Sequence, residues 1–374
     1  MDEMQKTNVA CVVGARPNFM KIAPILSEME RRDGFRPYLI HTGQHSSSEM
    51  AGAFFRDLGI RSPDVSLGIS GGSSNEQTAK VMLALEPLFA NQRPDLVLLV
   101  GDVNATAAAA LVAAKSNLRI AHVEAGLRSF DRTMPEEINR IVTDALSDFL
   151  FTTEPSAEEN LLREGIPQER IFFCGNVMID SLLRFQDRAA ASPVLEDLEL
   201  KSQKYILVTL HRPSNVDDPE KLGKLLEMLD RLAERIPVIF PAHPRTQNSM
   251  IANGLQLRGV NIIPPQGYIE FVRLMSAARL VLTDSGGVQE ETTILGVPCL
   301  TLRENTERPI TIAKGTNRLA GTNPEAVFEA VEEILRLRLS VFDKPELWDG
   351  HAAARIVDAL EQVLPKSQAA AVKP

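Results

Sequence analysis

A stretch between residues 122 and 140, which reads HVEAGLRSFDRTMPEEINR, concentrates side chains that transfer protons or bind anions. It holds four carboxylates and four basic residues, namely Glu124, Asp131, Glu136 and Glu137 with His122, Arg128, Arg132 and Arg140. The apolar run LRIAHV before it predicts a buried strand, and Pro135 followed by two glutamates is typical of the first turn of a helix. Glu124 is therefore expected just beyond the carboxyl end of a strand, where parallel open sheets bind their ligands.

We interpret Glu124 and Glu136 as functional carboxylates, because loop chemistry gathered at that edge of a sheet indicates binding or catalysis. For Asp131, Arg132 and Glu137 the sequence favours a plainer interpretation, a solvated loop followed by a capped helix.

Two strand-to-helix turns have the features of phosphate sites. In VVGARPNFMKIAPIL, Gly14 ends a strand and Pro17 opens a helix, and Arg16 and Lys21 lie near the start of that helix. In VLTDSGGVQEETTILG, the segment Ser285 to Gly287 begins a second helix directly after a strand.

One such turn in each half of the chain favours phosphate binding over tight packing alone. Neither turn matches the dinucleotide fingerprint GxGxxG or the P-loop, which argues against a redox or an ATPase function.

The histidines His211 and His243 each follow an apolar run, YILVTL and IPVIFPA, and so lie at predicted strand ends. An imidazole at such a position hydrogen-bonds a loop, donates to a phosphate or shuttles a proton, and we give His211 the functional interpretation. His45, in HTGQHSSSEM, is ambiguous. No HExxH or CxxC spacing occurs, so no metal site is predicted.

The composition is that of an ordinary globular chain, with 44% hydrophobic and 24% charged residues. A formal net charge of -9 argues against a nucleic-acid or anionic-membrane surface. Three cysteines, in or next to apolar runs, are interpreted as buried thiols. The acidic start and the lack of a long apolar run predict a cytoplasmic location.

The order of apolar runs predicts two α/β domains. Runs such as NVACVV, DLVLLV and RIAHV, and later YILVTL and ARLVLT, lack period-two alternation and alternate with amphipathic segments. We therefore expect two doubly wound Rossmann-like domains, residues 1–186 and 204–349, with the active site in the cleft between them. Residues 187–203 are the expected linker, 350–364 a terminal helix and 365–374 a disordered tail.

Motifs along nearly the whole chain resemble the non-hydrolysing UDP-N-acetylglucosamine 2-epimerases. They are GARPNFMK, GDVNAT, HVEAGLRS, MPEEINR, GNVMID, TDSGGVQEE and TERP, in this order. The resemblance implies the GT-B arrangement of two Rossmann domains, with a final helix returning to the first. It also implies interconversion of UDP-GlcNAc and UDP-ManNAc in the cytoplasm by a homodimer, without a nicotinamide or other cofactor, for surface polysaccharide synthesis.

The resemblance also assigns residues. It places the acid/base carboxylates at Asp102, Glu124 and Glu136, and the nucleotide and leaving-group site at Arg16, Lys21, His211, Ser285, Gly286 and Glu291, the last on the ribose. Arg140 and Arg308 match further active-site positions. Gln44, His45, Arg212 and His243 match parts of an allosteric site of some bacterial members, but Ser47 replaces a glutamine there and the stretch LGISGGSSNEQT lacks their arginine.

The chemistry explains the need for carboxylates. The C2 hydrogen of the sugar is not α to a carbonyl, but loss of UDP from C1 makes it acidic, and re-addition with protonation from the opposite face inverts C2. Four alternatives stay open: an epimerase for a related UDP-diacetamido uronic acid, a hydrolysing epimerase, a GT-B glycosyltransferase, and a nucleotide-sugar sensor. The TERP segment favours plain UDP-GlcNAc.

Overall fold

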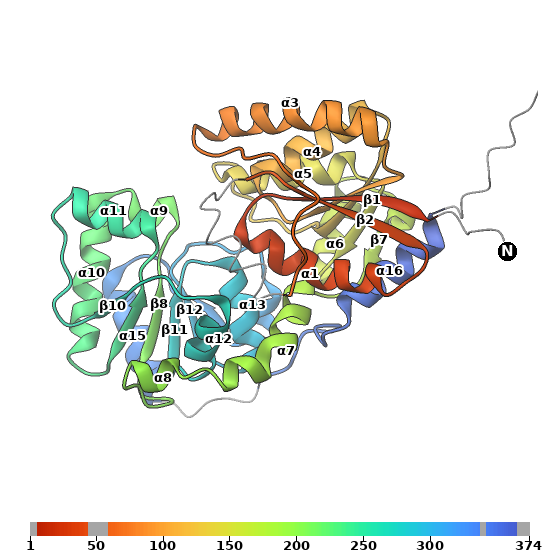
Figure 1. Cartoon of the computed structure of the whole chain (residues 1–374). Helices are drawn as coiled ribbons and strands as arrows, with labels where there is room; N and C mark the ends of the chain where they lie inside the picture. The colour runs from red at the N-terminus through yellow and green to blue at the C-terminus, as the bar shows by residue number, and fades with distance from the viewer. Residues whose placement is uncertain (1–5, 44–58, 337–341, 365–374) are drawn as a thin grey trace, which may run out of the picture. The chain divides into compact units, whose positions relative to one another are not determined.

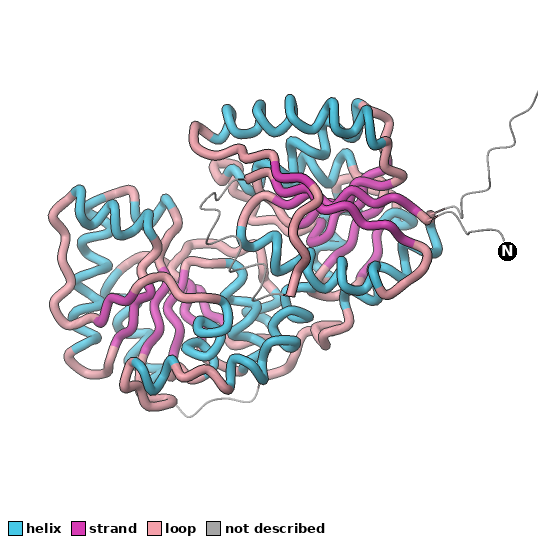
Figure 2. Tube along the Cα trace, viewed as in Figure 1, coloured by secondary structure: helices cyan, strands magenta, loops and turns pink. Residues whose placement is uncertain are grey.

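A computed structural model describes residues 6–43, 59–336 and 342–364. The chain divides into two compact units, the first formed by residues 1–181 and 346–374 and the second by residues 182–345. Each unit contains one parallel sheet with helices on its faces (Figures 1 and 2). This is the predicted α/β class. No helix in the described ranges is long and apolar enough to cross a membrane.

The sheet of the first unit has the strand order β3-β2-β1-β4-β5-β6-β7. Its strands are β1 (Thr7–Val13), β2 (Phe35–His41), β3 (Val65–Ser66), β4 (Leu96–Val100), β5 (Arg119–Ala125), β6 (Phe149–Thr152) and β7 (Ile171–Phe173). Its helices are α1 (Arg16–Glu30), α3 (Ser74–Gln92), α4 (Asn104–Lys115), α5 (Pro135–Leu146), α6 (Pro155–Arg163) and α16 (Ala352–Val363), with a short 3-10 helix at Gln168–Arg170.

Both faces of this sheet are covered, which is why its central strands read as unbroken apolar runs: all five residues of β4 are buried. Helices α3, α4 and α5 lie on one face and α1 and α16 on the other (Figure 1). Helix α4 reads NATAAAALVAAK. Alanine is the strongest helix former and the smallest apolar side chain, so α4 approaches both the sheet and its neighbours α3 and α5 closely.

The second sheet has the order β10-β9-β8-β11-β12-β13. Its strands are β8 (Ile206–Thr209), β9 (Val238–Pro241), β10 (Asn261–Ile263), β11 (Leu280–Thr283), β12 (Cys299–Thr301) and β13 (Asn317–Leu319). Its helices are α8 (Val194–Asp197), α9 (Pro213–Val216), α10 (Pro219–Ala233), α11 (Pro244–Ala252), α12 (Tyr268–Ser276), α13 (Gly286–Leu295), α14 (Ile310–Ala313) and α15 (Pro324–Arg336). Leucines of α10 and valines of α15 pack with β8, β9 and β11 in one apolar core.

The division between the units differs from the predicted linker at residues 187–203. It falls between Ser181 and Leu182, inside the continuous helix α7 (Val177–Ala190), and residues 187–203, with the short helix α8, belong to the second unit. The physical reason is burial: Val194 and Leu195 are packed into the unit instead of lying in solvent.

The C-terminal helix α16 belongs to the first unit. Asp180 accepts hydrogen bonds from the backbone N–H groups of Ala352 and Ala353, at 3.1 and 2.7 Å, and so caps the N-terminus of α16. Arg32, which follows α1, pairs with Asp358 on α16 at 2.6 Å. The expected disordered tail lies outside the described residues.

Candidate active site

Glu124 has the most unusual backbone among the predicted site residues. It lies in β5 with a φ of 72°, in the left-handed region that non-glycine residues rarely adopt, and the β5–β6 register shifts between Val123 and Ala125. Its side chain is buried and pairs with the ammonium group of Lys21 from α1. Strain of this kind persists only where the surrounding structure enforces it, and it gathers at functional sites.

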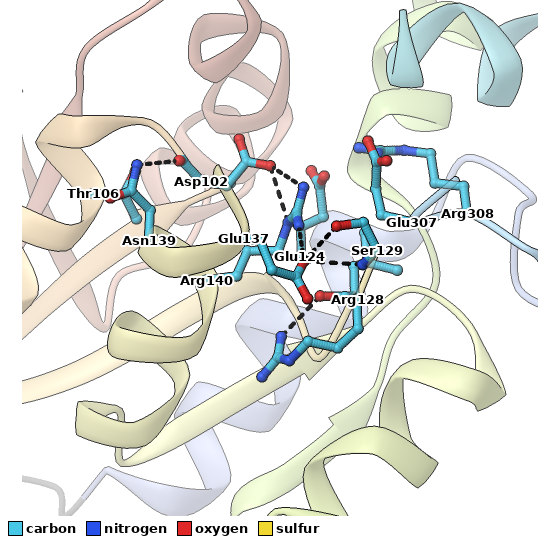
Figure 3. A network of polar contacts seen from close by, with 12 residues as sticks. Asp102, Thr106, Glu124, Arg128, Ser129, Glu137, Asn139, Arg140, Glu307 and Arg308 are labelled. Carbon is cyan, nitrogen blue, oxygen red and sulfur yellow. Dashed lines mark hydrogen bonds and ion pairs between the residues drawn. The ribbon is translucent and has the colours of Figure 1, made fainter. Parts of the chain in front are cut away.

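Asp102 follows β4, the strand next to β5, and is held by Arg140 from α5 (Figure 3). The Nε and Nη2 atoms of Arg140 lie 3.0 and 2.7 Å from Oδ2 of Asp102, and Asn139 donates to the Asp102 carbonyl at 2.8 Å. Arg140 is itself almost fully buried. The arginine thus connects α5 to the end of β4.

Glu137 was interpreted from the sequence as a solvated residue at the start of a helix, and the structure shows that this is wrong. The side chain is 1% exposed and accepts hydrogen bonds from the backbone N–H groups of Ser129 and Phe130, at 2.9 and 3.0 Å (Figure 3). It also pairs with Arg140 at 2.7 Å. An acidic residue in the first turn of a helix has the same pattern whether it faces water or a loop, so the sequence could not tell them apart.

The neighbours of Glu137 are less enclosed. Glu136, also in the first turn of α5, is half-buried. Asp131 accepts from the backbone N–H of Thr133 at 3.0 Å, and Arg132 is exposed, as expected for a loop.

The first phosphate-like turn is fixed by Asn18, which the sequence reading missed. Its Oδ1 accepts from the N–H groups of Gly14 and Ala15, at 3.2 and 3.0 Å, and its Nδ2 donates to the carbonyl of Val100 at 2.7 Å. A side chain at Gly101 would place a Cβ 2.7 Å from Nζ of Lys21 and would displace that ammonium group, and the positive φ of 66° there also favours glycine.

The second phosphate-like turn begins α13, with Ser285 at the N-cap and Gly286 as the first helical residue. A Cβ on Gly286 would lie 2.6 Å from Nη1 of Arg308. Arg308 is buried and pairs with Glu290 and Glu307, at 2.7 and 2.6 Å. The glycine thus admits an arginine beneath the N-terminus of the helix, where both favour an anion.

His211 is oriented by a buried aspartate that the sequence reading did not single out. Its Nδ1 lies 3.0 Å from Asp284, which also accepts from the N–H of Arg212 at 2.9 Å. Burial alone would raise the pKa of Asp284, but the charge of His211 and the hydrogen bonds from His211 and Arg212 outweigh it and lower the pKa. With Nδ1 held by the carboxylate, the other ring nitrogen is directed away from Asp284.

Glu291 lies in α13 and accepts a hydrogen bond from the hydroxyl of Tyr268 at 2.8 Å. Burial and the negative charge of Glu291 raise the pKa of Tyr268 well above its ordinary value, so the phenol remains a donor. Tyr268 begins α12 directly after Gly267, a strand-to-helix position that could have indicated it.

Of the residues matched to an allosteric site, two lie in the second unit. His243 is the N-cap of α11 and accepts from the N–H of Arg245 at 3.1 Å, and its ring lies 5.6 Å from that of His211. Arg212 approaches Glu307 at 3.7 Å. Gln44, His45 and the side chain of Arg16 lie outside the described residues.

Comparison with known proteins assigns the family. The model of the UDP-N-acetylglucosamine 2-epimerase family matches residues 27–361. The chain belongs to this family. It is 41% identical to a UDP-N-acetylglucosamine 2-epimerase of Methanococcus maripaludis, over 88% of this chain and 92% of that protein. It is 39% identical to a UDP-2,3-diacetamido-2,3-dideoxy-D-glucuronate 2-epimerase of Pseudomonas aeruginosa, over 95% and 99%.

A solved structure extends the likeness to three dimensions. The UDP-GlcNAc 2-epimerase of Methanocaldococcus jannaschii, in complex with UDP-GlcNAc and UDP, is 41% identical and has a TM-score of 0.90, covering 95% of this chain and 100% of that one. The present epimerase is therefore an enzyme with the predicted GT-B-type architecture. In its first unit the structure joins Lys21 to Glu124 and Arg140 to Asp102.

Proposed function

We propose that this epimerase reversibly converts UDP-GlcNAc to UDP-ManNAc by eliminating UDP and adding it back. A carboxylate removes the C2 proton, the C2–H electron pair forms the C1=C2 double bond, and the C1–O pair leaves with UDP. The products of this half-reaction are 2-acetamidoglucal and UDP. In the second half, the UDP oxygen attacks C1 and a proton reaches C2 from the opposite face, which inverts that carbon.

The environment of Glu124 is the observation that supports the proposal most strongly. A buried carboxylate on strained backbone, paired with a lysine at the carboxyl edge of a parallel sheet, is costly to maintain without a chemical role. Asp102 lies at the end of the adjacent strand, and Glu136 begins the helix that supplies Arg140. We assign proton transfer at C2 to these three carboxylates and contact with the leaving group to Lys21 and Arg140.

The second unit supplies a complementary set of groups for the nucleotide. In this proposal the N-terminus of α13, at Ser285 and Gly286, binds the diphosphate together with Arg308. His211 donates to the departing phosphate through the nitrogen that Asp284 leaves available. Glu291, oriented by Tyr268, accepts hydrogen bonds from the ribose hydroxyls. By its resemblance to the family motif, we assign Arg16 of the first unit to the same nucleotide site.

The decisive experiment incubates the purified protein with UDP-GlcNAc in deuterated water and follows the sugar by proton NMR. We expect UDP-ManNAc to appear without added NAD or metal, and deuterium to replace the C2 proton. Retention of the C2 proton in the epimerised sugar would refute elimination and re-addition. Release of free ManNAc would identify a hydrolysing epimerase, and UDP binding without turnover a sensor.

Variants test the carboxylates separately. Asp102→Asn, Glu124→Gln and Glu136→Gln should each lower turnover by about a hundredfold or more, as loss of a general acid or base does. A matched control is Glu158→Gln, a partly exposed carboxylate on α6 that accepts a hydrogen bond from Gln168, and its turnover should equal that of the wild type. A carboxylate whose amide variant keeps full turnover at saturating substrate is structural.

One relative supports a second candidate substrate. The Pseudomonas aeruginosa relative is named for a UDP-diacetamido-glucuronate, at an identity close to that of the UDP-GlcNAc enzymes. Comparing kcat/KM for the two nucleotide sugars decides between them, and we expect UDP-GlcNAc to be preferred. The proposal further places the enzyme in the cytoplasm as a homodimer that supplies ManNAc units for surface polysaccharide, and sedimentation analysis tests its oligomeric state.

A further inference from the structure

His122 is a fully buried histidine in β5, two residues before Glu124, and both of its ring nitrogens face acceptors. Nε2 lies 2.8 Å from the carbonyl of Gly101, and Nδ1 lies 2.6 Å from Oδ1 of Asp144 on α5. A carbonyl only accepts, so Nε2 donates to Gly101, and Nδ1 is hydrogen-bonded to Asp144. The ring is therefore held at both nitrogens.

Asp144 also binds two residues that follow Glu124 in the chain. Its other oxygen, Oδ2, accepts from the N–H of Gly126 at 3.1 Å and pairs with Nη1 of Arg128 at 2.7 Å. Burial would raise the pKa of Asp144, but the charges and hydrogen bonds of His122 and Arg128 outweigh it and lower the pKa. Asp144 thus stays ionised in the interior.

Arg128 continues this group of contacts. Its buried guanidinium also pairs with the exposed carboxylate of Glu164 at 2.7 Å. A buried charge is costly unless it is paired and hydrogen-bonded, and Arg128 has both Asp144 and Glu164 as partners.

The bonds of His122 and Asp144 reach all three elements that bear those carboxylates. Gly101 directly precedes Asp102, and Gly126 follows Glu124 by two residues. Asp144 lies near the end of α5, whose first turn contains Glu136. The end of β4, the bulge of β5 and helix α5 are therefore tied together by two side chains that are not themselves proposed to react.

We propose that His122 and Asp144 are positioning residues that hold Asp102, Glu124 and Glu136 at their working distance from C2 of the sugar. This inference rests on the proposed function, because it concerns where the proton-transferring groups stand. A displacement of about 1 Å is enough to cost a hundredfold in rate. If the carboxylates shift, protonation of the glycal slows, and 2-acetamidoglucal and UDP have longer to dissociate before the epimer forms.

The experiment measures the ratio of released 2-acetamidoglucal to UDP-ManNAc in Asp144→Ala and His122→Phe. The ratio is independent of how much of the sample is folded, so a loss of stability alone leaves it at the wild-type value. We expect a severalfold increase in both variants. An unchanged ratio in variants whose turnover has fallen would overturn the proposal.

Asp144→Asn is the matched control, because it keeps the hydrogen bonds. The amide oxygen accepts from Gly126 and Arg128, the amide nitrogen donates to Nδ1 of His122, and the ring still donates from Nε2. We expect a ratio close to that of the wild type, and an increase as large as that in Asp144→Ala would refute positioning by these hydrogen bonds. A wild-type protein that forms no UDP-ManNAc refutes the proposed function instead.

Discussion

Replacing Glu137 with glutamine is expected to destabilise the first unit by about 3 kcal/mol, which is the lower end of the cost of breaking a buried ion pair. The carboxylate accepts from the backbone N–H groups of Ser129 and Phe130, from the hydroxyl of Ser129 and from the guanidinium of Arg140. Each of these groups donates to it. An amide has one oxygen and one NH2 group, so whichever way it turns, a donor faces a donor and the negative charge is gone.

The size of this destabilisation depends on which contacts the partners of Glu137 keep in the variant. Arg140 keeps Asp102, so its charge is not left alone, which places the cost near 3 rather than 5 kcal/mol. The assay uses Trp348, the single tryptophan, which is buried in the first unit and donates to the carbonyl of Thr153 at 2.9 Å. With a slope of about 2 kcal/mol per molar urea, its fluorescence transition should shift down by about 1.5 M.

The adjacent Glu136 provides the control. Glu136 is less enclosed than Glu137, so Glu136→Gln should leave the free energy of unfolding, followed by Trp348 fluorescence, within about 0.5 kcal/mol of the wild type while turnover falls. A Glu137→Gln protein with the wild-type midpoint would show that the loop at Ser129 and Phe130 is held by other contacts. The reasoning from the buried carboxylate would then be wrong.

Three further predictions concern the second unit. Gly286→Ala should destabilise it by about 1–3 kcal/mol and weaken UDP binding measured by calorimetry, because the new Cβ displaces the paired side chain of Arg308. The control is Gly223→Ala, in the interior of α10 with only an ordinary 3.5 Å contact, which should be neutral or stabilising. Equal effects of the two substitutions would contradict the prediction. Asp284→Asn should lower turnover at every pH, since His211 loses the carboxylate that orients it, and an unchanged kcat would remove His211 from the mechanism. The folded state lowers the pKa of Asp284, so its stabilising contribution is complete above about pH 4 and is lost as the pH falls through the folded pKa. In urea denaturation followed by circular dichroism, the stability difference between wild type and Asp284→Asn should therefore shrink as the pH falls below that value.

The sequence predicted the central strands and the turns that follow them. Runs such as LRIAHV and ARLVLT are strands in the structure, α5 begins at Pro135, and α13 begins directly after Ser285. These features have strong local causes, namely continuous apolar burial, the fixed φ of proline and the exposed N–H groups of a glycine-rich helix start. The two-sheet fold class is confirmed by the strand order and by the likeness to solved epimerases.

Three short strands were missed, and all lie at sheet edges. Strands β3, β7 and β13 contain two or three residues each, too few to show any periodicity, and each has only one neighbouring strand to mark it. The predicted linker at 187–203 differs from the division of the structure, which falls inside α7. Its composition is small and polar on average, but two adjacent apolar residues, Val194 and Leu195, are buried in the second unit as part of the short helix α8.

Within the site, the sequence identified reactive groups but not the groups that support them. Glu124 was chosen for its place after a strand, yet its left-handed backbone is a tertiary property that no local pattern shows. His122 sits inside an apolar run and reads as a strand residue, although both its nitrogens are bonded. Asp284 and Tyr268 likewise act through a neighbour, so their significance depends on contacts across the fold. The roles of the predicted site residues stay predictions.

The return of α16 to the first unit has a consequence for synthesis of the chain. That unit is discontinuous in sequence: residues 182–345 are made before residues 346–374, which complete it. Until the segment with α16 leaves the ribosome, the face of α1 that packs against α16 has no cover, and Asp180 has no helix to cap. The nascent chain thus completes its second unit while its first is still unfinished, and the proposed catalytic carboxylates reach their final stability only once α16 has been made.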